Sequence, residues 1–341
     1  MSRSGFGGTL ESSSQCRPEG TRVTTAEHDP IAALPEDFGA LLAGAFDVHV
    51  HGQPDLAVSL HNRGDDLAVL RLAHAYGVSG WVLKSHLWLT TDRAAFLQRE
   101  ARDLGFSVYG SITLNPPMGG VSATVVELAA AHGARVVFLP TWGSAADAAR
   151  GGYISRLLGQ LAPSFPGYEA KTAISLLTPS GALSGECREV IDACRALGLA
   201  LATGHASLVE SRAVATYCAQ VGQRLLVTHP LHYTHDPGEL REFTRLGAFV
   251  EFCYAPLIHP DSHLSVRDVH EAMSALGPDR IVLSTDAFSR WAPPEPECLR
   301  MFVEQLAYLG WQPAQLRQMT AANPRAFLGI ETPEAPMEVA G

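Results

Sequence analysis

The sequence predicts an α/β fold, a (β/α)8 barrel of the TIM type, on three observations. Short apolar runs alternate with longer amphipathic stretches between residues 46 and 288 of the 341-residue chain, and such alternation indicates a parallel sheet. The eight units span about 240 residues, the size of a closed barrel. A glycine also recurs between a helical stretch and the next strand, where helix C-terminal caps need one. These glycines are Gly77, Gly105, Gly133, Gly198, Gly222 and Gly247.

Each expected strand is a short apolar run bounded by glycine, proline or polar residues. The eight runs are residues 46–51, 80–87, 106–114, 134–142, 200–207, 224–230, 248–256 and 280–288. The expected helices include residues 65–76, 91–104, 121–132, 187–197, 210–221 and 265–276, and a closing helix is expected over 313–330. No Gly-x-Gly-x-x-Gly turn follows the first strand, so a doubly wound open sheet is the less favoured alternative.

The expected barrel covers residues 41–330, between a polar lead-in at 1–40 and a short tail at 331–341. The lead-in is rich in Ser, Gly and Thr and lacks the apolar core of a signal peptide, which favours a flexible segment. One connection, residues 143–199, is much longer than the others and contains several Pro and Gly. We expect an excursion over the barrel mouth, which is either a lid or a surface embellishment.

Composition narrows the class of function. The net charge is −10 and no Lys/Arg cluster is present, which argues against nucleic acid as a partner. No apolar run reaches the length that crosses a bilayer, so we expect no membrane partner and a cytoplasmic protein. The six cysteines form no Cys-x-x-Cys pair, and a disulfide framework is not expected. Cys187 and Cys194 lie seven residues apart on one helix face, as packing residues do.

Ionisable residues stand at the ends of several expected strands. The first strand reads Asp47-Val-His49-Val-His51, and alternation places positions 47, 49 and 51 on one face. Active sites of such barrels lie where the carboxyl ends of the strands meet. Neutral imidazole and carboxylate are ligands of zinc and similar divalent ions, so we expect a metal site there. The other residues at strand ends are Lys84, His86, His205, His229 and Asp286.

This set resembles the amidohydrolase superfamily of metal-dependent hydrolases, over roughly residues 40–330. The resemblance is carried by His-x-His on the first strand, His205 and His229 on the fifth and sixth, and Asp286 on the eighth. The end of the chain, Met-Thr-Ala-Ala-Asn-Pro at 319–324, is similar to the closing helix of many members. The segments at 83–86, 112–115, 201–205 and 228–230, with Lys-Ser-His on strand two, further resemble an uncharacterised branch.

The resemblance implies a divalent metal cofactor, with zinc expected and manganese or iron as alternatives. In many members a carboxylated lysine on strand four bridges two metals, but the fourth strand here contains no lysine. Lys84 on strand two is the substitute candidate, which would give two ions. If Lys84 remains an ammonium, it would instead bind an anionic substrate or stabilise an oxyanion beside a single ion.

We assign roles to the residues on this basis. His49, His51, Lys84, His205, His229 and Asp286 are the expected ligands, and Asp286 is also the general acid–base. His86 is either a further ligand or a hydrogen-bond donor to the substrate, and the donor role is favoured. His232 is expected to contact substrate, with a solvated loop as the alternative. Tyr254 is a second candidate, although alternation prevents Glu251 and Tyr254 from both pointing inward without a bulge.

The expected function is hydrolysis of a small molecule, an amide, lactone or ester. Two alternatives keep the metal: phosphoester hydrolysis, and a non-hydrolytic decarboxylation or isomerisation. A third alternative is a barrel that binds metal or ligand without catalysis. A homo-oligomer is also considered, since four aromatic residues would either form its surface or pack inside: Trp291, Phe302, Tyr308 and Trp311.

Overall fold

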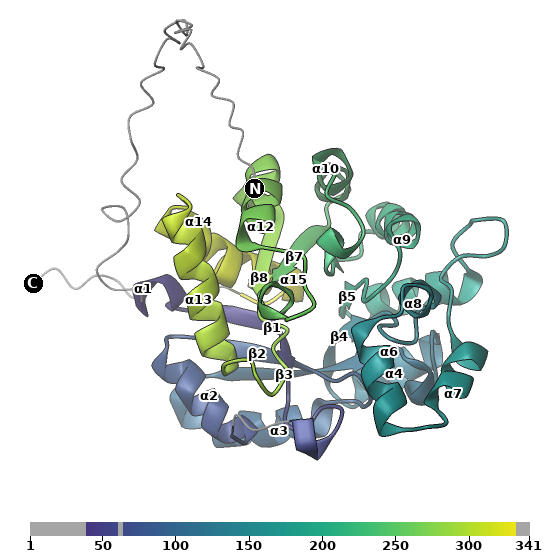
Figure 1. Cartoon of the computed structure of the whole chain (residues 1–341), viewed down its shortest axis with the longest axis horizontal. Coiled ribbons are helices and arrows are strands. Elements are labelled where there is room, and N and C mark those ends of the chain that lie inside the picture. The colour runs from purple at the N-terminus through teal and green to yellow at the C-terminus, as the bar shows by residue number, and fades with distance from the viewer. Residues whose placement is uncertain (1–38, 61–63, 332–341) are drawn as a thin grey trace, which may run out of the picture.

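The computed structural model describes residues 39–60 and 64–331, and these form a parallel eight-stranded barrel with helices around it (Figure 1). Each strand pairs with the next along the chain, from β1 to β8. The barrel closes between β8 and β1, where the Asp286 amide donates to the His49 carbonyl at 3.0 Å. The strands are β1 Phe46–His51, β2 Gly80–Lys84, β3 Ser107–Thr113, β4 Ala134–Phe138, β5 Ala200–Ala202, β6 Leu225–Val227, β7 Phe249–Cys253 and β8 Ile281–Ser284. The predicted fold class is therefore confirmed.

Several of the helices that follow the strands begin at polar N-caps whose side chains accept from the first turn. Ser207 and Ser265 each form a capping box with the residue three positions later, which satisfies free amides of the first turn. The larger helices around the barrel are α2 Asp66–Ala75, α3 Thr91–Glu100, α4 Ala123–Ala131, α8 Gly185–Ala196, α9 Leu208–Val221, α10 Pro237–Arg245, α12 Val266–Leu276 and α13 Glu295–Tyr308. Among the described residues, no helix combines the length and apolarity needed to cross a membrane.

The core has two layers, one inside the barrel and one between strands and helices. The inner layer includes Phe46, Val82 and Phe138. Phe327 and Leu328 pack in the same buried cluster. These last two belong to the predicted closing helix, which the structure forms as α14 Pro313–Arg317, a π-helical turn η6 Gln318–Ala322 and α15 Asn323–Leu328.

Strand β1 contains a bulge that changes the expected facing of its residues. Asp47 lies in register with Trp81 but Val50 with Leu83, so β1 has one residue more than β2 between these pairs. Asp47 therefore does not share the inner face with His49 and His51, as strict alternation predicted. Its carboxylate instead accepts from the His49 amide at 2.9 Å and from the Thr285 hydroxyl at 2.6 Å, which ties β1 to β8.

The excursion after β4 holds three short helices, α5 Ala145–Ala149, α6 Tyr153–Leu161 and α7 Phe165–Thr172. They pack on the barrel through their own apolar cluster, in which the Trp142 and Phe165 rings lie 5.1 Å apart. The last part of the predicted range 143–199 is the barrel helix α8, where a helix over 187–197 was expected. Cys187 and Cys194 are buried in α8 as packing residues.

Two of the four aromatic residues considered for an oligomer surface pack inside. Phe302 and Trp311 are buried in the outer core, whereas Trp291 and Tyr308 are about half exposed. Two further helices are short: α1 Gly39–Leu42 precedes the barrel, and α11 Ala255–Ile258 follows β7. The predicted lead-in at 1–40 and tail at 331–341 lie almost wholly outside the described residues.

Candidate metal centre and cavity

The strand-end residues converge on the carboxylate of Asp286. The Nε2 atoms of His49 and His51 each lie 2.9 Å from its Oδ1, and Nε2 of His229 lies 3.2 Å from its Oδ2. The side chains of His49 and His51 have no exposed area, while that of Asp286 is 12% exposed. One donor atom from each of His49, His51 and Asp286 lies within 4.8 Å of the others. This is a compact, buried set of nitrogen and oxygen donors.

Each histidine of β1 is backed by a second carboxylate. Nδ1 of His49 lies 3.1 Å from Glu251, which also accepts from the Ser284 hydroxyl at 2.6 Å. Nδ1 of His51 lies 3.0 Å from Oδ2 of Asp55. A proton held on Nδ1 leaves the Nε2 lone pair pointing at the cluster, which is the arrangement that metal-binding histidines require. The residues therefore fit a divalent cation held by His49, His51 and Asp286.

The electrostatics of the cluster agree with a site that holds a cation. Burial opposes charge on Asp286, yet the adjacent histidines hold its pKa well below the usual range. Burial also opposes charge on His49, but Asp286 and Glu251 together raise its pKa to about 9. The effect of the carboxylates on these pKa values thus outweighs the effect of burial. The resulting negative potential would attract a divalent cation to the cluster.

Lys84 lies at the edge of the same cluster. Its side chain is buried, and Nζ is 2.8 Å from Nε2 of His49. The geometry thus brings the predicted strand-two lysine to the predicted first-strand histidine.

His86 is held by Asp55, a residue that the sequence reasoning missed. The Asp55 carboxylate accepts from the His86 amide at 2.9 Å and from the Ser85 hydroxyl at 2.7 Å, and it contacts Nδ1 of His86. The His86 ring stacks on that of His51 at 4.3 Å. Burial lowers the pKa of His86 to about 3, so the ring is neutral with its proton on Nδ1. With the proton on Nδ1, Nε2 carries the lone pair of a hydrogen-bond acceptor or a metal ligand, and the role of His86 stays a prediction.

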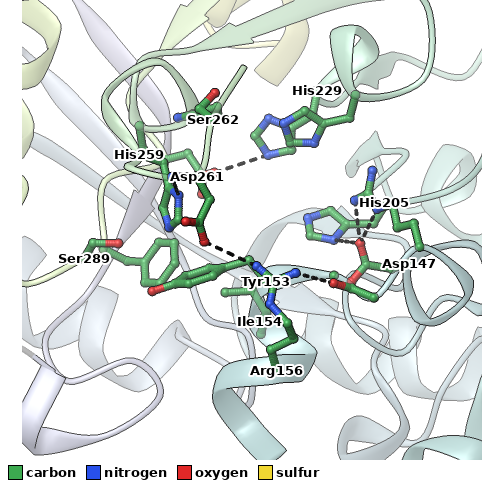
Figure 2. A pocket seen from close by; sticks show the side chains of 18 of the residues that line it. Asp147, Tyr153, Ile154, Arg156, His205, His229, His259, Asp261, Ser262 and Ser289 are labelled. Carbon is green, nitrogen blue, oxygen red and sulfur yellow. Dashed lines mark hydrogen bonds and ion pairs between the residues drawn. The ribbon is translucent and has the colours of Figure 1, made fainter. Parts of the chain in front are cut away.

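His205 is held by a carboxylate from the excursion. Nδ1 of His205 lies 3.0 Å from Oδ1 of Asp147 in α5, which also accepts from Nε of Arg150 at 2.9 Å (Figure 2). Burial lowers the pKa of His205 to about 4, so this ring is neutral as well. The centroid of the His205 ring is 5.8 Å from that of the His229 ring. Asp147 also escaped the sequence reasoning.

Two site residues adopt left-handed backbone conformations. His229 has φ 52° and Asp286 has φ 50°, and no other described non-glycine residue has a positive φ. Such conformations cost of order 1–3 kcal/mol and occur where surrounding structure demands a side-chain position. Each residue lies two positions after a strand end, and the turn directs its side chain to the common cluster.

The two predicted substrate residues have different outcomes. His232 lines the cavity and stacks on His229 at 5.1 Å, which keeps its substrate role as a prediction. Tyr254 is corrected, because its ring packs outside the strands against Phe302 at 5.4 Å and its hydroxyl accepts from Gln305. Alternation explains this: Glu251 points inward to His49, and three positions later the side chain points outward.

A cavity of about 550 Å³ opens above the cluster, large enough for a small organic molecule. Its inner end is lined by His86, His205, His229 and Asp286. Its outer part lies between the excursion and the loops after β7 and β8, and Figure 2 shows it together with His205 and His229 of the inner end. The residues of this outer part include Tyr153, Ile154, Arg156, His259, Asp261, Ser262, Phe288 and Ser289.

Fold and site together define a (β/α)8 barrel with a candidate His/Asp metal centre at the carboxyl ends of its strands. Residues 44–251 match the model of DUF6282, described as a family of unknown function, and the chain belongs to this family. No curated protein matches the chain.

Solved structures share the architecture at low identity. An amidohydrolase from Pseudomonas aeruginosa is 14% identical, with a TM-score of 0.57 over 88% of this chain and 98% of that one. An organophosphorus hydrolase from Deinococcus radiodurans is 17% identical, with a TM-score of 0.54 over 85% of this chain and 94% of that one. A mutant organophosphorus hydrolase is 16% identical, with a TM-score of 0.56 over the same shares. These likenesses show the fold alone.

Proposed function

We propose that this chain is a metal-dependent hydrolase that cleaves an amide, lactone or ester bond of a small molecule. The observation that carries the proposal is the convergence of His49 and His51 on Asp286, with a buried carboxylate behind each histidine. A bound divalent cation, zinc before manganese or iron, would supply a Lewis acid and a water of lowered pKa. His49, His51 and Asp286 would hold it.

Asp286 has the position of a general acid–base. Of the three clustered residues it alone has an exposed side chain, and that side chain lines the cavity. With its pKa well below the usual range, the carboxylate is ionised at neutral pH and can accept a proton. His86 would orient the substrate by accepting a hydrogen bond at Nε2, and His232 would contact the substrate from the opposite wall.

We propose that Lys84 is carboxylated and serves as a ligand shared by two ions, the second also held by His205 and His229. A buried ammonium beside His49 would repel the first cation, whereas a carbamate would attract both. Cytoplasmic location and a homo-oligomeric state also stay predictions.

The test is metal analysis of the purified wild type and of Lys84→Ala, with assays on ester, lactone, amide and phosphoester panels. Two equivalents that fall to one in Lys84→Ala would support the shared-ligand proposal, and one equivalent that is insensitive to Lys84 would contradict it. A metal-free wild type, even after reconstitution, would overturn the whole proposal. Turnover of phosphoesters alone would show a phosphoester hydrolase in place of an amide, lactone or ester hydrolase. Retained metal without any turnover would favour a protein that binds metal or ligand without catalysis.

A further inference from the structure

An aromatic wall begins at the candidate metal centre. The ring of Phe288 lies 5.4 Å from that of His51 and 5.2 Å from that of His86. Tyr153, at the start of α6, continues the wall with its ring 6.1 Å from Phe288. Phe288 and Tyr153 both line the cavity, so a ligand whose reactive group reaches the cluster can contact these two rings.

The same wall continues to the cavity rim. The His259 ring meets that of Tyr153 edge-on at 4.4 Å, and Trp291 lies 5.4 Å from His259 and 6.5 Å from Tyr153. Trp291 is 48% exposed, so aromatic surface extends from the buried cluster to solvent. Aromatic faces at these spacings suit a planar ring, which they can contact edge-to-face or in offset stacking.

The charged groups of the cavity wall do not favour an anionic ligand. Among the described residues that line it, the two guanidinium groups each face a carboxylate: Arg150 pairs with Asp147, and Arg156 lies 3.6 Å from Asp261. Figure 2 shows Arg156 reaching toward Asp261 across the mouth. Burial lowers the pKa of His259, which favours its neutral form near pH 7. A carboxylate entering this space would meet guanidinium groups that already face carboxylates.

We propose that the substrate is an uncharged molecule with an aromatic ring, its reactive carbonyl at the cluster and its ring against Phe288 and Tyr153. This inference rests on the proposed function, because it takes the cluster as the place where the carbonyl reacts. It narrows the substrate class to neutral aromatic esters, lactones and amides. The specificity-determining residues are Tyr153, which lines the cavity, and Trp291, which lies outside the lining residues and packs against Tyr153 and His259.

Binding of three hydroxamates to the zinc-loaded full chain, measured by isothermal titration, tests the inference without turnover. Zinc content is measured first. Benzohydroxamate and cyclohexanecarbohydroxamate differ in the planarity of the ring, and 4-carboxybenzohydroxamate adds a negative charge. We expect benzohydroxamate to bind roughly three- to tenfold tighter than the cyclohexane probe, the worth of one aromatic contact. We expect the carboxylated probe to bind at least about tenfold more weakly than benzohydroxamate.

Substitutions test which residues cause the preference for the phenyl ring. Tyr153→Leu should reduce the preference for the phenyl ring while Phe288 retains part of it, and Trp291→Leu, at an exposed position, should reduce it less and without affecting folding. Tyr308→Leu, at an exposed tyrosine of α13 outside the residues that line the cavity, is the matched control and should keep the preference.

Four results would count against the inference, in distinguishable ways. A wild type that holds no zinc overturns the proposed function and this inference with it. A zinc-loaded protein that binds all three hydroxamates equally overturns the inference and leaves the proposed function intact. Tighter binding of the carboxylated probe overturns the neutral charge of the substrate, and an unchanged phenyl preference in both Tyr153→Leu and Trp291→Leu overturns the assigned wall.

Discussion

The two sides of the barrel mouth obtain their supporting carboxylates from different places. On the β1 side, His49 is held by Glu251, a residue of β7 within the sheet itself. On the opposite side, His205 is held by Asp147, a residue of the excursion helix α5. The first side is thus an intrinsic part of the barrel, whereas the second depends on an inserted segment.

This difference teaches what the excursion does. Both sequence alternatives, lid and surface embellishment, treated it as an addition to a finished site. The structure instead makes α5 part of the support of His205, while α6 supplies Tyr153 to the cavity wall. The two sides can therefore be separated by substitutions that remove one carboxylate at a time.

Replacing His49 with alanine should have the largest effect, because it breaks the side that the barrel builds. His49→Ala removes a ligand and leaves the buried Glu251 carboxylate without its imidazole partner. We expect loss of bound metal, loss of measurable turnover and destabilisation by about 1–3 kcal/mol. Elemental analysis and denaturant unfolding measure these. His263→Ala, at the outer cavity wall, is the control and should keep its metal. Full metal content in His49→Ala would contradict the ligand assignment.

Asp286→Asn, reloaded to the metal content of the wild type, should still show turnover lowered by about 10²–10⁴-fold. Asparagine is the suitable replacement, because residue 286 has φ 50° and Asn tolerates this conformation better than Ala. The amide keeps one oxygen for the cluster but cannot take up a proton. Steady-state kinetics beside metal analysis separate the two effects. Unchanged turnover would remove Asp286 from proton transfer.

A matched pair of variants, Glu251→Gln and Asp147→Asn, compares the two sides directly. Each replaces a carboxylate that holds a histidine Nδ1, and losses of such partners typically weaken metal binding by about 10–100-fold. We expect Glu251→Gln to weaken the ion bound by His49 and His51, and Asp147→Asn to weaken only the second ion. Competition with a chelator, followed ion by ion, measures this. Equal loss of both ions in both variants would show that the two sides are not independent.

The sequence predicted the barrel, the order of its strands and most of the clustered residues, because apolar runs and glycine caps recur at the right spacing. Some strands are shorter than predicted. The expected strand 80–87 is observed as β2 Gly80–Lys84, and the expected strand 200–207 as β5 Ala200–Ala202. Near the mouth the chain leaves the ladder so that polar side chains can turn inward, while the apolar pattern continues.

Other features carry no periodic signal. The bulge in β1 lets both Val48 and His49 face the barrel interior, and it depends on pairing with β2 that alternation cannot express. Asp147 lies in the five-residue helix Ala-Ala-Asp-Ala-Ala, where small residues show no amphipathic pattern. Its role comes from tertiary contact with His205, across 58 positions of the chain.

Gly152→Ala should give the smallest effect and tests the excursion side without removing a polar group. Gly152 has an ordinary negative φ, but an added Cβ would overlap the Asp147 carboxylate. We expect this overpacking to destabilise the fold by about 1–3 kcal/mol. A displaced Asp147 should also weaken binding of the proposed second ion, as Asp147→Asn does. Gly159→Ala in α6 is the matched control, because its Cβ would lie 3.8 Å from Pro166 and should stabilise the helix by about 0.5–1 kcal/mol. If Gly152→Ala loses stability but keeps both ions, then α5 supports His205 loosely, and the excursion contributes wall rather than site.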